Sequence, residues 1–267
     1  MGLAPNGLTR RQLGGLMLAA PFAMASGRAM AAAEVTPKAL FYDVFGTVMD
    51  WRRGVARESE RILGARGFKL DWLKFADAWR ALYQPAMEEV RSGRRSFVKL
   101  DVLHREMLEK IRPQFGLKEV PEDALADLNL AWHRLDAWPD VKEGFARLGR
   151  RFLMAPCSNG NIALMADLAR RNSIRWDAIL GSDIARDYKP KPGVYLAAAE
   201  AFNLKPSECM MVAAHSGDLA SAAAVGLHTA HVARPNEYGP NTGEPGPKVP
   251  VDYSAKSMMD LADKLGA

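Results

Sequence analysis

Asp43 stands directly after the apolar run 39–42, which is typical of a strand buried on both faces. At the carboxyl edge of such a sheet a carboxylate can meet ligands, and it can act as a covalent nucleophile. Gly46 allows a sharp turn, and Thr47 offers a hydroxyl just behind the acid. The alternative interpretation is that Asp43 only caps the helix that follows.

Polar side chains also follow two later apolar runs. Ser158 and Asn159 come after one of them, and His215 and Asp218 come after the other. Small polar residues between a buried strand and a helix can present a hydroxyl and backbone N–H groups to an anion. Ser158 or Asn159 can equally cap the helix that begins there, and both interpretations stay open.

The spacing of apolar residues predicts the elements that would hold these side chains. Strands are expected at 39–42, 152–157, 178–180, 209–213, 228–233 and 251–254. Helices without a convincing strand are expected at 57–63, 72–90, 100–111 and 124–135. This order predicts an α/β fold, a Rossmann-like parallel-sheet core with an inserted helical cap domain. We place the core at 37–53 and 136–267 and the cap at 54–135.

Composition excludes several classes of protein. The 267 residues are 48% hydrophobic and 25% charged, which is ordinary for a globular chain. The net charge of +5 does not describe the rest of the chain, because residues 1–31 hold three arginines and no acid. The rest of the chain is nearly balanced, so nothing favours nucleic acid or an anionic membrane surface as a partner. The two cysteines, Cys157 and Cys209, are too few for a disulfide framework and are expected to be buried thiols.

Residues 1–31 are typical of an export signal. The segment Thr9-Arg10-Arg11-Gln12-Leu13 resembles a twin-arginine motif, an apolar run 13–25 follows it, and 29–31 is a small-residue cleavage site. The run is too short for an ordinary transmembrane helix. We therefore expect a signal peptide at 1–31 and a periplasmic protein, or a cytoplasmic one if the signal is not used. The alternative is a poorly ordered, mildly apolar tail.

The segment Asp43-Val44-Phe45-Gly46-Thr47 resembles the first motif of the haloacid dehalogenase superfamily. The resemblance implies that Asp43 is the nucleophile. Phosphatases of that superfamily carry a second acid where this chain has Phe45, and a phenyl ring cannot transfer a proton. An aromatic residue there, followed by Gly-Thr, is similar to the L-2-haloacid dehalogenase branch.

Three later segments extend the resemblance. Arg80 follows Trp79, and this pair resembles the Trp-Arg pair of the family whose arginine receives the departing halide. The alternative is that Arg80 is an ordinary exposed cation on a helix. Arg91, Arg94 and Arg95 have no such match and are expected in a solvated turn.

The remaining motif residues follow the same resemblance. Ser158 would hold the substrate carboxylate, and Asn159 would help to hold the halide. Lys189 begins a Lys-Pro-x-Pro segment with Tyr195 six residues later, and it would lie near Asp43. The site implied at this stage has Asp43, Lys189, Asp218, Thr47 and His215 as catalytic residues and Arg80, Ser158, Asn159, Phe45, Tyr195 and Val44 as substrate- or halide-binding residues.

The implied reaction is hydrolysis of small (S)-2-haloalkanoic acids to (R)-2-hydroxyalkanoic acids through an aspartyl ester. Asp218 would orient or activate the water, and Lys189 would stabilise charge. No metal and no cofactor are expected, because Phe45 and Ala214 stand where magnesium-dependent relatives carry acids. The expected partners are the haloacid and the halide, and a homodimer is implied by the resemblance alone. The alternatives are an atypical phosphatase of the superfamily and a non-catalytic periplasmic binder of small carboxylates.

His215 is the point where this chain departs from the better-known pattern, which has an asparagine there. One interpretation is a neutral histidine that hydrogen-bonds within its loop. The other is that it positions the hydrolytic water, since a neutral imidazole can accept a proton near neutral pH and an amide cannot.

Overall fold

The computed structural model describes Met1 and residues 36–267. The signal peptide predicted at 1–31 lies outside the described residues, apart from Met1. Among the described residues, no helix is both long and apolar enough to cross a membrane.

The described part of the chain is built on a sheet of five parallel strands in the order β2-β1-β3-β4-β5. Their bounds are β1 Ala39–Tyr42, β2 Leu153–Pro156, β3 Cys209–Ala213, β4 His228–Val232 and β5 Tyr253–Ala255. The first strand lies between β2 and β3, with Phe41 paired to Ala155 on one side and to Met211 on the other. The predicted parallel-sheet core is confirmed. The prediction of a strand at 178–180 was wrong. Just before this segment, Met154 N of β2 donates to the side-chain Oδ2 of Asp177 and not to a backbone oxygen, so no backbone ladder forms there.

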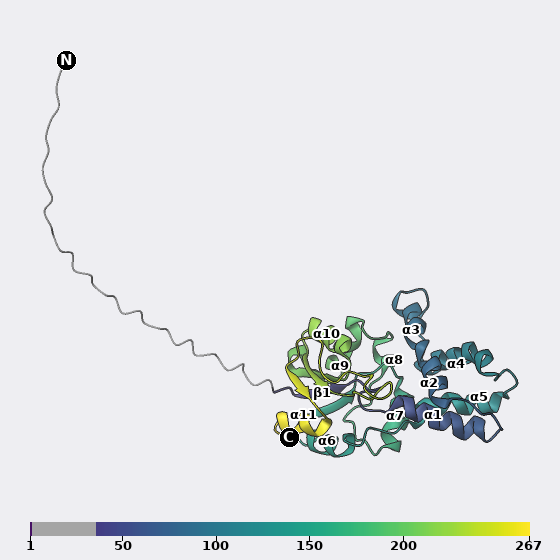
Figure 1. The fold of residues 1–267 in the computed structure, drawn as a ribbon. Coiled ribbons are helices and arrows are strands. Elements are labelled where there is room, and N and C mark those ends of the chain that lie inside the picture. Colours follow the sequence, from purple (N-terminus) through teal and green to yellow (C-terminus); the bar gives the residue numbers. More distant parts are fainter. Residues whose placement is uncertain (2–35) are drawn as a thin grey trace. The chain divides into compact units, whose positions relative to one another are not determined.

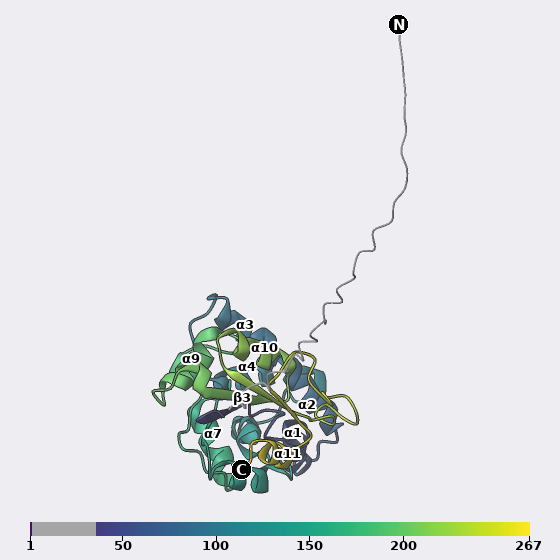
Figure 2. The same cartoon turned by 90° about the vertical axis from the view of Figure 1, so that its left-hand side faces the viewer.

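Alternate residues of β1 enter two different core clusters, as the period of a strand requires. Leu40 and Tyr42 pack in one cluster, and Ala39 and Phe41 pack in the other. Helices cover both faces of the sheet (Figure 2). They are α6 Val141–Leu148, α7 Ile162–Arg171 and α11 Met258–Lys264 against the first cluster, and α9 Pro192–Glu200 and α10 Ser216–Ala224 against the second, with the short α8 Ser182–Ala185 before α9. Both cysteines are buried free thiols, as predicted.

All named elements between β1 and α6 are helices, and the outer ones gather at one side of the sheet (Figure 1). This segment holds α1 Trp51–Ser59 with a further turn at Glu60–Gly64, α2 Trp72–Ala81, α3 Tyr83–Arg91, α4 Leu100–Ile111, a turn at Arg112–Phe115, α5 Glu122–Asn129 and a last turn at Leu130–Arg134. The helix predicted at 72–90 is in fact two, with the break at Leu82. Pro85 explains it, since it has no N–H for the carbonyl of Ala81 and its ring would clash there.

The chain leaves the core and returns to it along adjacent paths. Asp50 N donates to Asp136 O at 2.9 Å, and Trp138 N donates to Val48 O at 3.0 Å. The two connections between the core and the inserted helices therefore hold each other in register.

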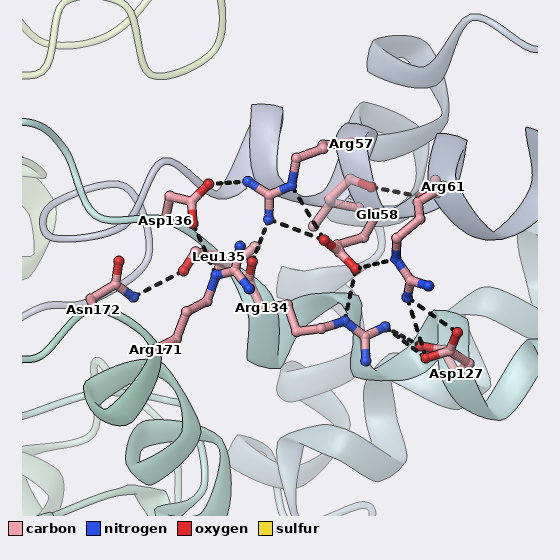
Figure 3. Close-up of polar contacts among 11 residues, drawn as sticks. Arg57, Glu58, Arg61, Asp127, Arg134, Leu135, Asp136, Arg171 and Asn172 are labelled. Atoms are coloured by element: carbon pink, nitrogen blue, oxygen red, sulfur yellow. Dashed lines mark hydrogen bonds and ion pairs between the residues drawn. The ribbon is translucent and has the colours of Figure 1, made fainter.

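An ionic network reinforces these paired connections (Figure 3). Its centre is Glu58, a carboxylate only 4% exposed. Arg61 Nε donates to it at 3.0 Å, Arg134 Nε at 2.8 Å and Arg57 Nε at 3.2 Å. Burial alone would raise the pKa of Glu58, but the hydrogen bonds from Arg61 and Arg134 lower it. Arg57 extends the network to Asp136, where the chain returns to the core.

Replacing Glu58 should destabilise the protein because three guanidinium groups lose a buried partner. We expect Glu58→Gln to lower the free energy of unfolding at pH 7 by about 3–5 kcal/mol. The matched control is Asp136→Asn in the same network, whose side chain is 54% exposed and should cost about 1 kcal/mol or less. Urea denaturation of both variants measures the difference. Since the pKa of Glu58 is lowered, the gap between wild type and Glu58→Gln should be full above the ordinary value of 4.5 and shrink as pH falls below it.

Candidate active site

The carboxyl edge of the sheet collects the polar side chains that follow the strands. Asp43 N donates to Val212 O at 3.0 Å, and Cys157 N donates to Tyr42 O at 2.8 Å, so the parallel ladder continues one residue beyond β1 on both sides. The side chain of Asp43 therefore leaves the sheet between the ends of β2 and β3. Open α/β sheets bind ligands at this place.

The Asp43 carboxylate is 7% exposed and has a partner at each oxygen. Lys189 Nζ donates to Oδ1 at 2.8 Å, Thr47 Oγ1 donates to Oδ2 at 2.8 Å, and His215 Nδ1 lies 3.1 Å from Oδ2. Burial alone would raise the pKa of Asp43, but the charge of Lys189 and the contact with His215 hold it well below its ordinary value. Asp43 is therefore ionised, which is the form that can attack carbon.

Thr47 is held so that it can only donate to Asp43. Its Oγ1 accepts a hydrogen bond from Ala214 N at 2.8 Å, which leaves the hydroxyl proton for the carboxylate. The predicted hydroxyl behind the acid is thus in contact with it.

Lys189 connects two carboxylates. Its Nζ lies 2.8 Å from Asp43 Oδ1 and 2.6 Å from Asp218 Oδ2, and Tyr195 OH donates to the other Asp218 oxygen at 2.6 Å. The backbone N of Lys189 donates to Asn159 Oδ1 at 2.7 Å. Burial lowers the pKa of Lys189, but the charges of Asp218 and Asp43 raise it well above its ordinary value. The ammonium group therefore stays charged.

The inserted helices hold the same loop from the other side. Arg91, the last residue of α3, donates from Nη1 to the backbone oxygen of Lys189 at 2.8 Å, and its side chain is only 9% exposed. Tyr188 OH donates to Val98 O at 2.6 Å. The expectation that Arg91 lies in a solvated turn was wrong, because its guanidinium spans from α3 to the Lys189 backbone. Arg94 is solvated as predicted, with 57% of its side chain exposed.

Arg80 on α2 has its guanidinium among aromatic rings. The guanidinium carbon lies 3.8 Å from the ring centre of Tyr83, 5.2 Å from Trp51 and 5.7 Å from Phe45. Its Nη1 is buried and has no hydrogen-bond partner among the described residues. Aromatic faces stabilise the cation but leave its N–H groups unsatisfied, which is costly at a buried position. Arg80 can therefore donate to an anion in front of it.

A cavity of about 400 Å³ brings most of the predicted residues together, within the range of small-molecule sites. The predicted residues that line it are Asp43, Phe45, Arg80, Asn159, Lys189, Tyr195, His215 and Asp218. Thr47, Ser158 and Val44 are buried and do not line it. Ser158 instead accepts a hydrogen bond from Gly160 N at 3.1 Å, and neither Ser158 nor Asn159 caps α7, which begins after Asn161.

Among the site residues that sequence reasoning missed, Glu237 and Tyr238 come from one loop. Both lie in the long loop between β4 and β5, which the sequence showed only as rich in glycine and proline. Tyr238 lines the cavity, and Glu237 is 2% exposed behind it. The available signal was position, because this loop follows a strand at the same edge of the sheet as Asp43.

His215 stands between two carboxylates. Its Nδ1 lies 3.1 Å from Asp43 Oδ2, and its Nε2 lies 2.8 Å from Glu237 Oε2. Burial lowers the pKa of His215, but the hydrogen bonds and charges of Asp43 and Glu237 outweigh it and raise the pKa to about 10. The imidazole is therefore charged at neutral pH before any reaction, whereas both sequence interpretations took it as neutral.

A Rossmann-like parallel sheet with a helical insertion, a buried ionised aspartate at the strand edge and a lysine beside it define a hydrolase with a capped core and an aspartate nucleophile. The family model described as "haloacid dehalogenase-like hydrolase" matches residues 37–226. The chain belongs to this family.

Individual relatives carry more specific names than the family model does. The chain is 28% identical over 207 residues to (S)-2-haloacid dehalogenase 1 of Pseudomonas sp. (strain CBS-3), covering 75% of this chain and 88% of that protein. The crystal structure of a defluorinating L-2-haloacid dehalogenase is 43% identical with a TM-score of 0.84, covering 86% of this chain and 96% of that one. A second L-2-haloacid dehalogenase structure is 40% identical with a TM-score of 0.83, covering 86% and 99%.

Gly46 should be irreplaceable in this site. It has φ +90°, and a Cβ added there would overlap the Glu237 carboxylate. We expect Gly46→Ala to lower the melting temperature and to abolish turnover. Gly67→Ala is the matched control, because Gly67 has φ +86° with nothing within 4 Å of the added atom. It carries the same backbone strain, about 1–2 kcal/mol, without the overlap, and its turnover should be normal. Equal effects of the two substitutions would contradict the steric role of Glu237.

Proposed function

We propose that this protein hydrolyses small (S)-2-haloalkanoic acids to (R)-2-hydroxyalkanoic acids through an ester of Asp43. The observation that carries the proposal is a single cavity lined by an ionised, buried Asp43 and by Arg80, a cation with an unsatisfied N–H. Such a cavity supplies a nucleophile and a receiver for the departing anion. The names of the relatives point to the same reaction.

Ester formation follows from these two groups. A carboxylate oxygen of Asp43 attacks the halogen-bearing carbon from the side opposite the halogen and inverts that carbon. The carbon–halogen bond breaks, and its electron pair leaves with the halide towards Arg80. A halide needs no proton to leave, so Phe45 at the cavity wall, in place of an acid, suits this step.

Hydrolysis of the ester returns Asp43 to its ionised form. Water attacks the acyl carbon of the ester, and negative charge develops on the Asp43 oxygen that did not attack the substrate. Lys189 contacts Oδ1 and Thr47 contacts Oδ2 in the free enzyme, so either oxygen has a donor beside it. Both oxygens of Asp218 are occupied, by Lys189 and by Tyr195. We therefore assign Asp218 to holding Lys189 in position.

The substrate carboxylate and halide would meet the remaining predicted residues. Asn159 lines the cavity and accepts from Lys189 N through Oδ1, so its Nδ2 is the atom that can donate to an anion. Ser158 does not line the cavity and accepts a hydrogen bond from Gly160 N, so among these residues Asn159 is the donor that we propose for the substrate. Val44 is buried and does not line the cavity, so we assign it to packing.

The direct test is halide release from chloro-, bromo- and fluoro-substituted acids, with and without a chelator. We expect release from (S)-2-chloropropionate, none from the (R) form, and no loss on chelation. Fluoroacetate belongs in the panel because one solved relative is described as defluorinating. Among residues 36–267, no group of three or more His, Cys, Asp or Glu side chains is placed to hold a metal ion. Phosphate release that a chelator abolishes would instead favour a phosphatase, and tight binding without halide release would favour a binding protein.

The ester itself can be detected by isotope. In a single turnover in H₂¹⁸O, the label should enter the Asp43 carboxylate and not the product, because water attacks the acyl carbon. Asp43→Asn should fold normally and release no halide, since an amide is a poor nucleophile of nearly the same shape. Mass spectrometry of the enzyme and of the hydroxy acid reads both results. Label in the product of that first turnover would exclude the ester.

Arg80 should act mainly in the transition state. Arg80→Lys keeps the charge and loses the planar fork, so we expect kcat to fall about 10²-fold or more. Arg94→Ala, which removes a cation paired with Glu89 at the surface, is the control and should leave kcat unchanged. Steady-state halide release measures both variants. Normal kcat in Arg80→Lys and in Arg80→Ala would remove Arg80 from the reaction.

We also propose that residues 1–31 direct the protein to the periplasm and that the mature protein forms a homodimer. The twin-arginine pattern at Arg10 and Arg11 supports export. Replacing both by lysine should retain the protein in the cytoplasm on cell fractionation. The dimer rests on family resemblance, and sedimentation of the purified protein tests it.

A further inference from the structure

Glu237 is a buried acid that the proposed reaction leaves unused. Its Oε1 accepts a hydrogen bond from Trp51 Nε1 at 3.0 Å, and its Oε2 lies 2.8 Å from His215 Nε2. Arg234, three residues earlier, fixes the loop, because its Nε donates to Thr47 O at 2.9 Å and its Nη1 to Asp140 at 2.9 Å. The Glu237 carboxylate is therefore buried, at 2% exposure, and held in a fixed position beside His215.

His215 itself lines the cavity and faces a carboxylate with each ring nitrogen. Only the protonated ring can donate to both acids at once. Charge in and around the cavity is then balanced between three carboxylates and three cations. They are Asp43, Asp218 and Glu237 against Lys189, Arg80 and His215.

Ester formation removes one charge from this balance. As an ester, Asp43 is neutral, and His215 loses the carboxylate at Nδ1 while its burial is unchanged. Burial favours the neutral ring, and Glu237 alone remains to favour the charged one. Glu237 also selects which proton stays, because it keeps a hydrogen on Nε2 and leaves the Nδ1 lone pair towards the ester.

We infer that Glu237 is a positioning residue that makes His215 a proton switch, charged while Asp43 is free and a base for the attacking water once Asp43 is an ester. The inference rests on the proposed function and deepens it. It assigns the activation of water to His215 held by Glu237, in a chain whose Asp218 is occupied by Lys189.

The steps balance in atoms and charge. In the first, the carbon–halogen bond breaks, the Asp43–carbon bond forms, and the Nδ1 proton of His215 passes through the cavity to solvent. In the second, water oxygen bonds to the acyl carbon of Asp43 and one water proton goes to Nδ1. The bond from the acyl carbon to the product oxygen then breaks, and that oxygen takes the remaining proton. Haloacid and water give hydroxy acid, halide and one proton, and the proton appears with the halide.

Other charged groups around His215 do not change during the reaction. Glu244 contacts Ser216, the residue after His215, through the backbone N at 3.2 Å and the hydroxyl. Burial would raise the pKa of Glu244, but these bonds lower it, so it stays ionised. His231 on β4 is buried 3.9 Å from Glu244, and burial lowers its pKa. With Lys189, they set a constant background, and only Asp43 switches.

The test compares wild type with Glu237→Gln in single turnovers of (S)-2-chloropropionate. Ester formation should be nearly normal in the variant, whereas ester hydrolysis should slow by about 10²-fold or more, so that the ester accumulates on quenching. Proton release is followed with an indicator dye at pH 6, where ionised Asp43 still keeps the His215 ring of the variant charged before the reaction. One proton per halide should be released before the hydroxy acid forms. Protons that appear only with the hydroxy acid would overturn the inference, as would wild-type hydrolysis by the variant.

The pH profile separates this role from mere support of the fold. Ester hydrolysis should rise with pH as His215 loses its proton, and this limb should lie at lower pH in Glu237→Gln, which lacks the negative partner. Glu244→Gln makes the same charge change in the same loop without a hydrogen bond to His215, so its limb should move less than that of Glu237→Gln. A limb that does not move in Glu237→Gln refutes the switch. If wild type releases no halide at all, the proposed function fails instead.

Discussion

A carboxylate that stays ionised with little contact with water is the constraint on which the site depends. Burying such a group costs several kcal/mol unless it is well paired, and Asp43 has three partners. Each of them needs a further one: Lys189 has Asp218, Thr47 accepts from a backbone N–H, and His215 has Glu237. The reactivity of one aspartate is thus set by groups two contacts away.

The sheet and the inserted helices divide this work. Residues after the ends of β1, β3 and β4, together with Lys189 between α8 and α9, supply the groups that keep Asp43 charged. The insertion supplies Arg80, a cation among aromatic rings. The nucleophile and the anion receiver come from different parts of the chain. The paired connections between these parts are reinforced by the ionic network around Glu58.

Much of this could be predicted from local pattern. The runs 39–42 and 209–213 are strands with the predicted bounds, since continuous apolar residues mark a doubly covered strand. The helix at 72–90 was predicted too long because periodicity runs on through Pro85. The nucleophile, halide and carboxylate roles came from family resemblance. Glu237 was missed because it meets His215 from a loop without periodic pattern, and contacts of that kind exist only once the chain has folded.

The bond from Arg91 to Lys189 has a consequence for motion. It ends on a backbone oxygen, so no substitution at position 189 can remove it, and Tyr188 adds a second bond to the same loop. Any displacement that separates both α3 and the residues around Val98 from this loop must break both bonds, one of which ends on the backbone of the residue that keeps Asp43 charged. Separation of the inserted helices from the core is therefore coupled, through one backbone group, to the loop that carries the cation beside Asp43.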